Sequence, residues 1–274
     1  MKYLFLLLIS ISILCSSAIA DEAANSQVIA PSWQGLSGLY TVPTARTIGA
    51  KKIALNFSEP KHVEYVPTKT TSGRFMDRQI RQNLVYGIND KLEVWVGRSK
   101  NVLDYARTPK LPNTIFFMFG LKYQIVEEDR EKGTPAIAFA IRDIGDDMKD
   151  ISPLKGIYNG RKYYLLATKK LSQLPDGRFA DATIGLAKDD NTFSGMFGLE
   201  LSVTNNLSFI AEGTTDSNFI NFREFGEDNV NGRFTYNTGL RFTPETMKGT
   251  VIDFGFIGDG AFEFSFGWSF IRQL

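Results

Sequence analysis

The chain has 274 residues, of which 31 are Lys or Arg and 30 are Asp or Glu, and 43% are hydrophobic. Such a balance of charge gives no electrostatic footprint for nucleic acid, so no nucleic-acid partner is expected. One His and one Cys exclude a multi-histidine or Cys/His metal site. We also predict no catalytic residues, no cofactor and no metal. What has to be explained is an aromatic content of 13%, with 22 Phe.

The N-terminus carries an export signal. Met1-Lys2 precedes an apolar run from Tyr3 to Leu14, and small residues then lead to an A-x-A pattern ending at Ala20. This pattern predicts a cleaved secretory signal peptide over residues 1–20. Cleavage there removes Cys15, so the exported protein would hold no disulfide. No later stretch has the roughly 18 consecutive apolar residues of a membrane helix, so a membrane location would require strands.

The rest of the chain has a period of two residues, which is the signature of β-strands. At the C-terminus Phe262, Phe264, Phe266, Trp268 and Phe270 alternate with small or polar residues, and Ile271 to Leu274 follow. The same alternation predicts twelve strands near 51–57, 79–87, 92–98, 114–124, 135–142, 162–171, 180–188, 195–203, 207–213, 233–243, 250–257 and 261–270. The fold class is therefore all-β, with about 12 antiparallel strands.

Alternation alone does not distinguish a soluble sandwich from a membrane barrel, but two features favour the barrel. The apolar face is crowded with aromatic rings, which lipid accepts without close packing. Long connections at 58–78, 99–113, 143–161 and 214–232 would all lie at one end of such a barrel, and tight turns at 88–91 and 204–206 at the other. We therefore expect a transmembrane β-barrel over 51–274 in the bacterial outer membrane, with outer-membrane lipid and the barrel assembly machinery as partners. The alternative is a soluble periplasmic β protein.

In the barrel interpretation the polar face of each strand lines the lumen. Its ionic groups would pair with one another across a wet interior. Trp95 shares this face with Glu93 and Gly97, which makes it the aromatic residue to test for glycan contact. The candidate lumen-facing residues are Arg81, Glu93, Trp95, Lys122, Arg142, Glu200, Glu212, Arg233, Arg241, Asp253 and Glu263.

Residues 21–50 precede the first expected strand and contain Gly35-Leu36-Ser37-Gly38 followed by Pro43-Thr44-Ala45-Arg46. Pro43 lacks a backbone donor and imposes extended geometry on Val42, and the glycines permit close backbone approach. The favoured interpretation is an ordered periplasmic segment against the base of the barrel, with Arg46 paired locally. The alternative is a short plug or an inserted strand.

This segment resembles the N-terminal G-L-x-x-x-P-T-A-R signature of the YjbH-like family of outer-membrane proteins. The resemblance extends through Ile141-Arg142-Asp143 and the segments at 163–170, 195–200, 211–213 and 237–240. It implies an outer-membrane β-barrel associated with exopolysaccharide production, in a version shorter than most family members, with no catalytic residues to carry over.

The leading functional hypothesis is a non-enzymatic barrel that assists exopolysaccharide or capsule secretion or envelope assembly, with polysaccharide as a partner. Twelve strands lie between the small filled barrels and the large porins, so a narrow pore is an alternative. Another is an outer-membrane enzyme acting on lipid or lipopolysaccharide, for which His62 and the pair Glu200 and Glu212 are the residues to test.

Overall fold

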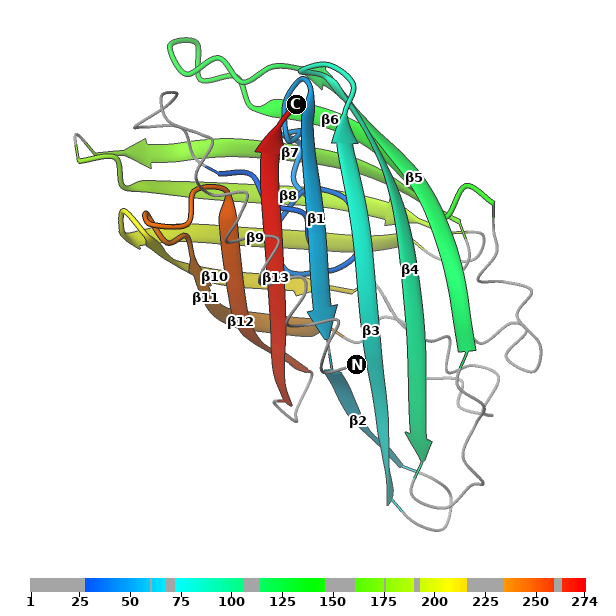
Figure 1. Cartoon of the computed structure of the whole chain (residues 1–274). Coiled ribbons are helices and arrows are strands. Elements are labelled where there is room, and N and C mark those ends of the chain that lie inside the picture. The colour runs from blue at the N-terminus through cyan, green and yellow to red at the C-terminus, as the bar shows by residue number, and fades with distance from the viewer. Residues whose placement is uncertain are drawn as a thin grey trace.

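The structure is a computed structural model, and it describes residues 28–59, 61–67, 72–105, 114–145, 161–174, 176–189, 193–215, 234–258 and 263–274. The predicted signal peptide at 1–20 lies outside these residues. The regular elements of the described chain are all strands, and none of the described residues forms a helix long and apolar enough to cross a membrane. Figure 1 shows the strands side by side in a sheet that curves around on itself.

Thirteen strand segments are present. They are β1 (Lys52–Glu59), β2 (Lys61–Pro67), β3 (Ser72–Gly87), β4 (Leu92–Tyr105), β5 (Thr114–Val126), β6 (Ala136–Arg142), β7 (Lys162–Gln173), β8 (Phe179–Lys188), β9 (Phe193–Thr204), β10 (Leu207–Thr214), β11 (Thr235–Phe242), β12 (Thr250–Gly258) and β13 (Glu263–Gln273).

The strands form one closed antiparallel barrel. Neighbours in sequence pair from β3 to β13, and β1 closes the ring by pairing with β13 on one side and β3 on the other. Both β1 and β2 pair with β3, so together they occupy one position in the wall. The barrel therefore has twelve strands, which confirms the predicted fold class.

Strand bounds differ from the prediction mainly at one end of the barrel. The expected loop 58–78 contains β2 and the first residues of β3, and β4 continues to Tyr105. The alternation of apolar residues fades there, but ladder hydrogen bonds join backbones and do not depend on side-chain polarity. At the other end, β13 continues through Ile271 to Gln273, which pairs with Lys52. The residues after Phe270 thus complete the closing strand.

The two faces of the wall differ in chemistry. In β6 buried and half-buried side chains alternate without a break. Outward-facing apolar side chains are exposed all around the barrel, including Phe117, Leu165, Ile184, Phe197, Phe209, Leu240, Phe254 and Phe264. Inward-facing polar and charged side chains are buried. Trp268 lies on the outer face, where its ring is 5.7 Å from that of Phe57.

The interior is filled by the N-terminal segment. Residues 30–48, called the plug from here on, lie inside the ring of strands, where Figure 1 shows them as a blue trace. Ala30, Trp33 and Tyr40 are fully buried although they belong to no strand. The interpretation of this segment as a periplasmic stretch against the base of the barrel was wrong, and the plug alternative describes it. The polar groups of the inner wall need hydrogen-bond partners, which lipid cannot provide. The backbone of the plug provides them.

Candidate functional site in the barrel lumen

The plug is a compact pair of turns with its own hydrogen bonds. Bridges join Pro31 to Ser37 and Gly38 to Pro43. The Trp33 N–H donates to the Tyr40 carbonyl at 2.7 Å, and the two rings stack with centroids 4.7 Å apart. Because the plug satisfies only part of its backbone internally, the remaining donors and acceptors require partners on the wall.

Glu212 on β10 holds the second turn. Its carboxylate accepts hydrogen bonds from three consecutive backbone N–H groups, those of Tyr40 at 3.2 Å, Thr41 at 2.8 Å and Val42 at 3.1 Å. It also accepts from the Thr41 hydroxyl and from the Asn237 amide. A buried carboxylate is stable only when hydrogen bonds replace its water shell, and the plug backbone supplies most of them.

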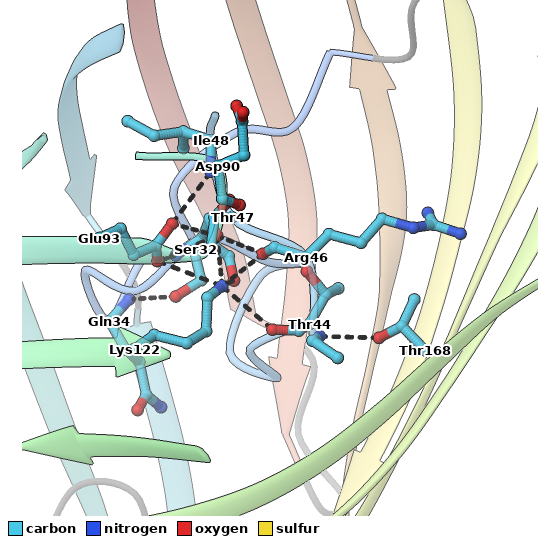
Figure 2. A network of polar contacts seen from close by, with 12 residues as sticks. Ser32, Gln34, Thr44, Arg46, Thr47, Ile48, Asp90, Glu93, Lys122 and Thr168 are labelled. Carbon is cyan, nitrogen blue, oxygen red and sulfur yellow. Dashed lines mark hydrogen bonds and ion pairs between the residues drawn. The ribbon is translucent and has the colours of Figure 1, made fainter. Parts of the chain in front are cut away.

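Glu93 and Lys122 form a second anchor, which Figure 2 shows from close by. Glu93 accepts from the N–H groups of Ser37 and Ile48, both at 3.0 Å. Lys122 donates to the carbonyls of Ser37, Thr44 and Arg46, at 3.0, 3.0 and 2.6 Å. The two charges lie 3.1 Å apart and are fully buried. Each neutralises the other, and the plug backbone satisfies their remaining hydrogen-bonding capacity.

Arg241 on β11 supports Gly38, at the start of the second turn. Its Nε and Nη2 form a two-pronged pair with Asp253 at 2.9 and 3.2 Å, and Nη2 also donates to the Gly38 carbonyl. Glu200 lies 3.5 Å from the same guanidinium. These groups do pair with one another, as the sequence predicted, but Arg241 and Asp253 are register partners on the neighbouring strands β11 and β12 and do not reach across the lumen.

Arg46 ties the end of the plug to the wall. Its guanidinium binds Glu128, in the connection between β5 and β6, at 2.7 Å and also contacts Asp181 on β8. These partners are 82 and 135 residues away in the sequence, so the expected local pairing of Arg46 was wrong. Burial alone would raise the pKa of Glu128. The hydrogen bond from the Lys170 backbone N–H and the attraction of Arg46 outweigh this effect and hold that pKa below its ordinary value.

Glycines on the inner wall make room for the plug. A Cβ at Gly255 would lie 3.0 Å from the Tyr40 ring and 3.2 Å from the Trp33 ring. Trp95 lies against Gly97 and Gly120 of the wall and Gly35 of the plug, and is only 3% exposed. Trp95 is therefore a contact between wall and plug, and its covered ring does not fit the hypothesis that it stacks on a glycan.

Nine of the eleven candidate lumen residues are buried on the inner face: Arg81, Glu93, Trp95, Lys122, Arg142, Glu200, Glu212, Arg241 and Asp253. Arg233 lies outside the described residues. Glu263 lies in β13, but the structure describes only its backbone. Sequence reasoning missed the plug partners Thr168, Asp181 and Asn237, which lie on the same face by the same alternation.

A small cavity lies beside the plug. It measures about 20 Å³, room for roughly one water molecule, and lies between Ala30 and Leu39 of the plug and Glu200 and Arg241 of the wall. Among the described residues no group of three His, Cys, Asp or Glu side chains could hold a metal ion. Of the residues named above for the enzyme alternative, Glu212 accepts hydrogen bonds from the plug, and His62 lies in β2, of which the structure describes only the backbone.

No family model matches this chain, and no curated protein matches it. Among solved structures it is similar to an outer-membrane channel from Pseudomonas putida F1, with 10% identity, a TM-score of 0.48 and coverage of 92% of this chain and 99% of that one. It is also similar to the translocator domain of the autotransporter NalP from Neisseria meningitidis, with 8% identity, a TM-score of 0.42 and coverage of 82% and 89%. OprB from Pseudomonas putida follows at 9% identity, a TM-score of 0.31 and coverage of 81% and 91%. No residue roles carry over at these identities, so the site is interpreted from its own contacts.

Proposed function

We propose that the protein is a non-enzymatic outer-membrane β-barrel whose lumen is closed by its own N-terminal segment. The observation that carries this proposal is the plug. Its contacts come from every strand between β3 and β13, from Arg81 on β3 through Glu212 on β10 to Gly267 on β13. Because the segment is held on so many sides, we infer that it closes the lumen.

The outer surface supports a membrane location. A closed barrel has no free strand edges, so all of its backbone groups can pair without water. Exposed Phe, Leu and Ile side chains cover the outside, where a water-soluble protein would carry polar residues. Purified protein should migrate faster on gels before heating than after, and it should fractionate with the outer membrane. A chain that stays monomeric in water without detergent would overturn this location.

Conductance tests the closure. The wild-type protein in planar lipid bilayers should show little or no current, whereas variants that loosen the plug should show channel openings. Twelve strands enclose less space than the sixteen of general porins, so even an open barrel should conduct less than they do. Steady wild-type current of general-porin size would refute a closed lumen.

We further propose a role in exopolysaccharide secretion or envelope assembly. The support is the resemblance of the Gly35 to Arg46 segment to the YjbH-like signature, together with the finding that this same segment forms the plug. Deletion of the gene should lower secreted polysaccharide, and wild-type protein should restore it. Unchanged polysaccharide in the deletion strain would argue against the role while leaving the closed barrel intact.

A further inference from the structure

The charge of Arg142 is left without a partner inside the barrel. Arg142 is the last residue of β6 and is 2% exposed. Its Nη1 donates to the side-chain carbonyl of Gln34 in the plug. Its Nε and Nη2 have no hydrogen-bond partner in the described chain, and no carboxylate there pairs with it. The next residue, Asp143, is also buried, and although the residue has contacts of its own, its Oδ1 accepts no hydrogen bond in the described chain.

A buried guanidinium in this state is unusual. Removing an unpaired charge from water costs several kcal/mol, which is why buried arginines normally have carboxylate partners. Arg241 in the same lumen shows the normal arrangement, because its Nε and Nη2 grip both oxygens of Asp253. The two nitrogens that lack a partner in Arg142 are this same pair, which fits two oxygens of one anionic group.

Other donors gather beside Arg142. Trp95 Nε1 and the side-chain nitrogen of Gln34 are buried and also lack acceptors. Trp95 Nε1 lies over Gly120, where a Cβ would overlap with it, and Gly120 is the partner of Arg142 in the β5–β6 ladder. On the other side of Arg142, Lys162 of β7 is in register and buried.

We propose that Arg142, Trp95 and Gln34 form a binding site for an anionic oxygen-bearing group, a carboxylate or a phosphate, at the turn of the plug. The Nε and Nη2 of Arg142 hold two oxygens of the group, and the indole N–H of Trp95 and the amide of Gln34 donate to it from the side. Because Gln34 belongs to the plug, the bound group contacts both the wall and the plug. The site does not depend on whether the lumen conducts.

Thermal unfolding of the full-length protein in detergent tests this site. The probes are sodium glucuronate as the carboxylate, inorganic phosphate, and glucose as the neutral control, at equal ionic strength. Wild-type protein should be stabilised by at least one anion at millimolar concentration and not by glucose. Arg142→Met should lose this response, with affinity at least about tenfold weaker, since a good charged pair is worth more than about 1.4 kcal/mol.

The variants separate binding from folding. Without ligand, Arg142→Met should be as stable as wild type or more so, because it replaces a buried unpaired charge by an apolar side chain of similar length. Arg142→Lys keeps the charge but loses the two-pronged geometry, so it should bind more weakly and serves if the Met variant fails to fold. Trp95→Phe should weaken binding by a few fold, and Arg98→Gln, which changes an outward-facing arginine, should leave it unchanged.

The results distinguish the sources of the anion. A response to glucuronate alone identifies an acidic sugar, a response to phosphate alone identifies a phosphorylated ligand, and a response to both supports the shared chemistry. No anion-specific stabilisation of the wild type would mean that water satisfies these donors, and the site would be refuted. Equal stabilisation of wild type and Arg142→Met would also refute it, whether or not the barrel conducts.

Discussion

Removal of the Glu212 carboxylate should release the plug. In Glu212→Leu the N–H groups of Tyr40, Thr41 and Val42 lose their acceptor at once. Each buried amide left unpaired costs about 1–3 kcal/mol, so the three amides together would destabilise the bound plug by about 3–9 kcal/mol. The net loss is smaller, because the variant no longer has to bury a carboxylate. Glu212→Gln keeps one acceptor oxygen and should cost less. Its NH₂ group would face one N–H of the plug, which loses its acceptor at a cost of about 1–3 kcal/mol.

The barrel itself should survive both changes, because the ladder between β9, β10 and β11 uses backbone groups. The assay is single-channel recording in planar bilayers, with the gel shift on heating as a check that the barrel is intact. Channel openings should be rare in wild type, more frequent in Glu212→Gln and most frequent in Glu212→Leu. Glu127→Gln and Glu127→Leu, at an exposed glutamate in the β5–β6 connection, are the matched controls.

The reasoning fails if Glu212→Leu forms an intact barrel that remains as closed as wild type and unfolds at the same temperature. That outcome would mean that the three amides find other acceptors, or that the plug is held by Glu93 and Arg241 alone.

Three further predictions concern the contacts between wall and plug. Gly255→Leu should overlap with Tyr40 and Trp33 and lower the free energy of unfolding by about 1–3 kcal/mol, whereas Gly195→Leu, with no atom within 4 Å of a Cβ there, should be neutral in chemical denaturation. Trp33→Ala should cost about 3–5 kcal/mol by leaving a cavity beside Tyr40, and an equal cost for Trp268→Ala on the outer face would contradict this placement. Glu128 has a lowered pKa, so its bond to Arg46 stabilises the fold above the ordinary glutamate value near 4.5 and is lost as pH falls through the lower folded value. The difference in melting temperature between wild type and Glu128→Gln should therefore shrink on acidification below that range, and a constant difference would show that the bond contributes nothing.

The wall could be predicted from the sequence because its physical cause is local. One face of a strand in a membrane barrel contacts lipid and the other faces the interior. Neighbouring residues therefore alternate between apolar and polar, and this alternation can be found in the sequence. This is why twelve strands were found, and why residues such as Lys122 and Asp253 were assigned to the inner face. β2 and the adjoining ends of β3 and β4 were missed, because the alternation of apolar residues in the sequence fades there.

The plug could not be placed by the same reasoning. It has no period, and its partners are remote, with 171 residues between Thr41 and Glu212. A signal was nevertheless present on the wall. Gly97, Gly120, Gly198, Gly239, Gly255 and Gly267 all fall on the inner face. A small barrel whose interior positions are so often glycine cannot fill itself with its own side chains, so another segment has to occupy the space.

The closure of the ring by β1 and β13 has a consequence for assembly. The plug precedes β1 in the chain, yet the residues that grip it are spread over the strands up to β13. Strands as late in the chain as β13 therefore help to enclose a segment that precedes β1. Contacts so distant along the chain form slowly, because the ends of long loops must meet first. The sheet thus closes around the N-terminal segment. A barrel that lacks this segment should close late or with the wrong circumference.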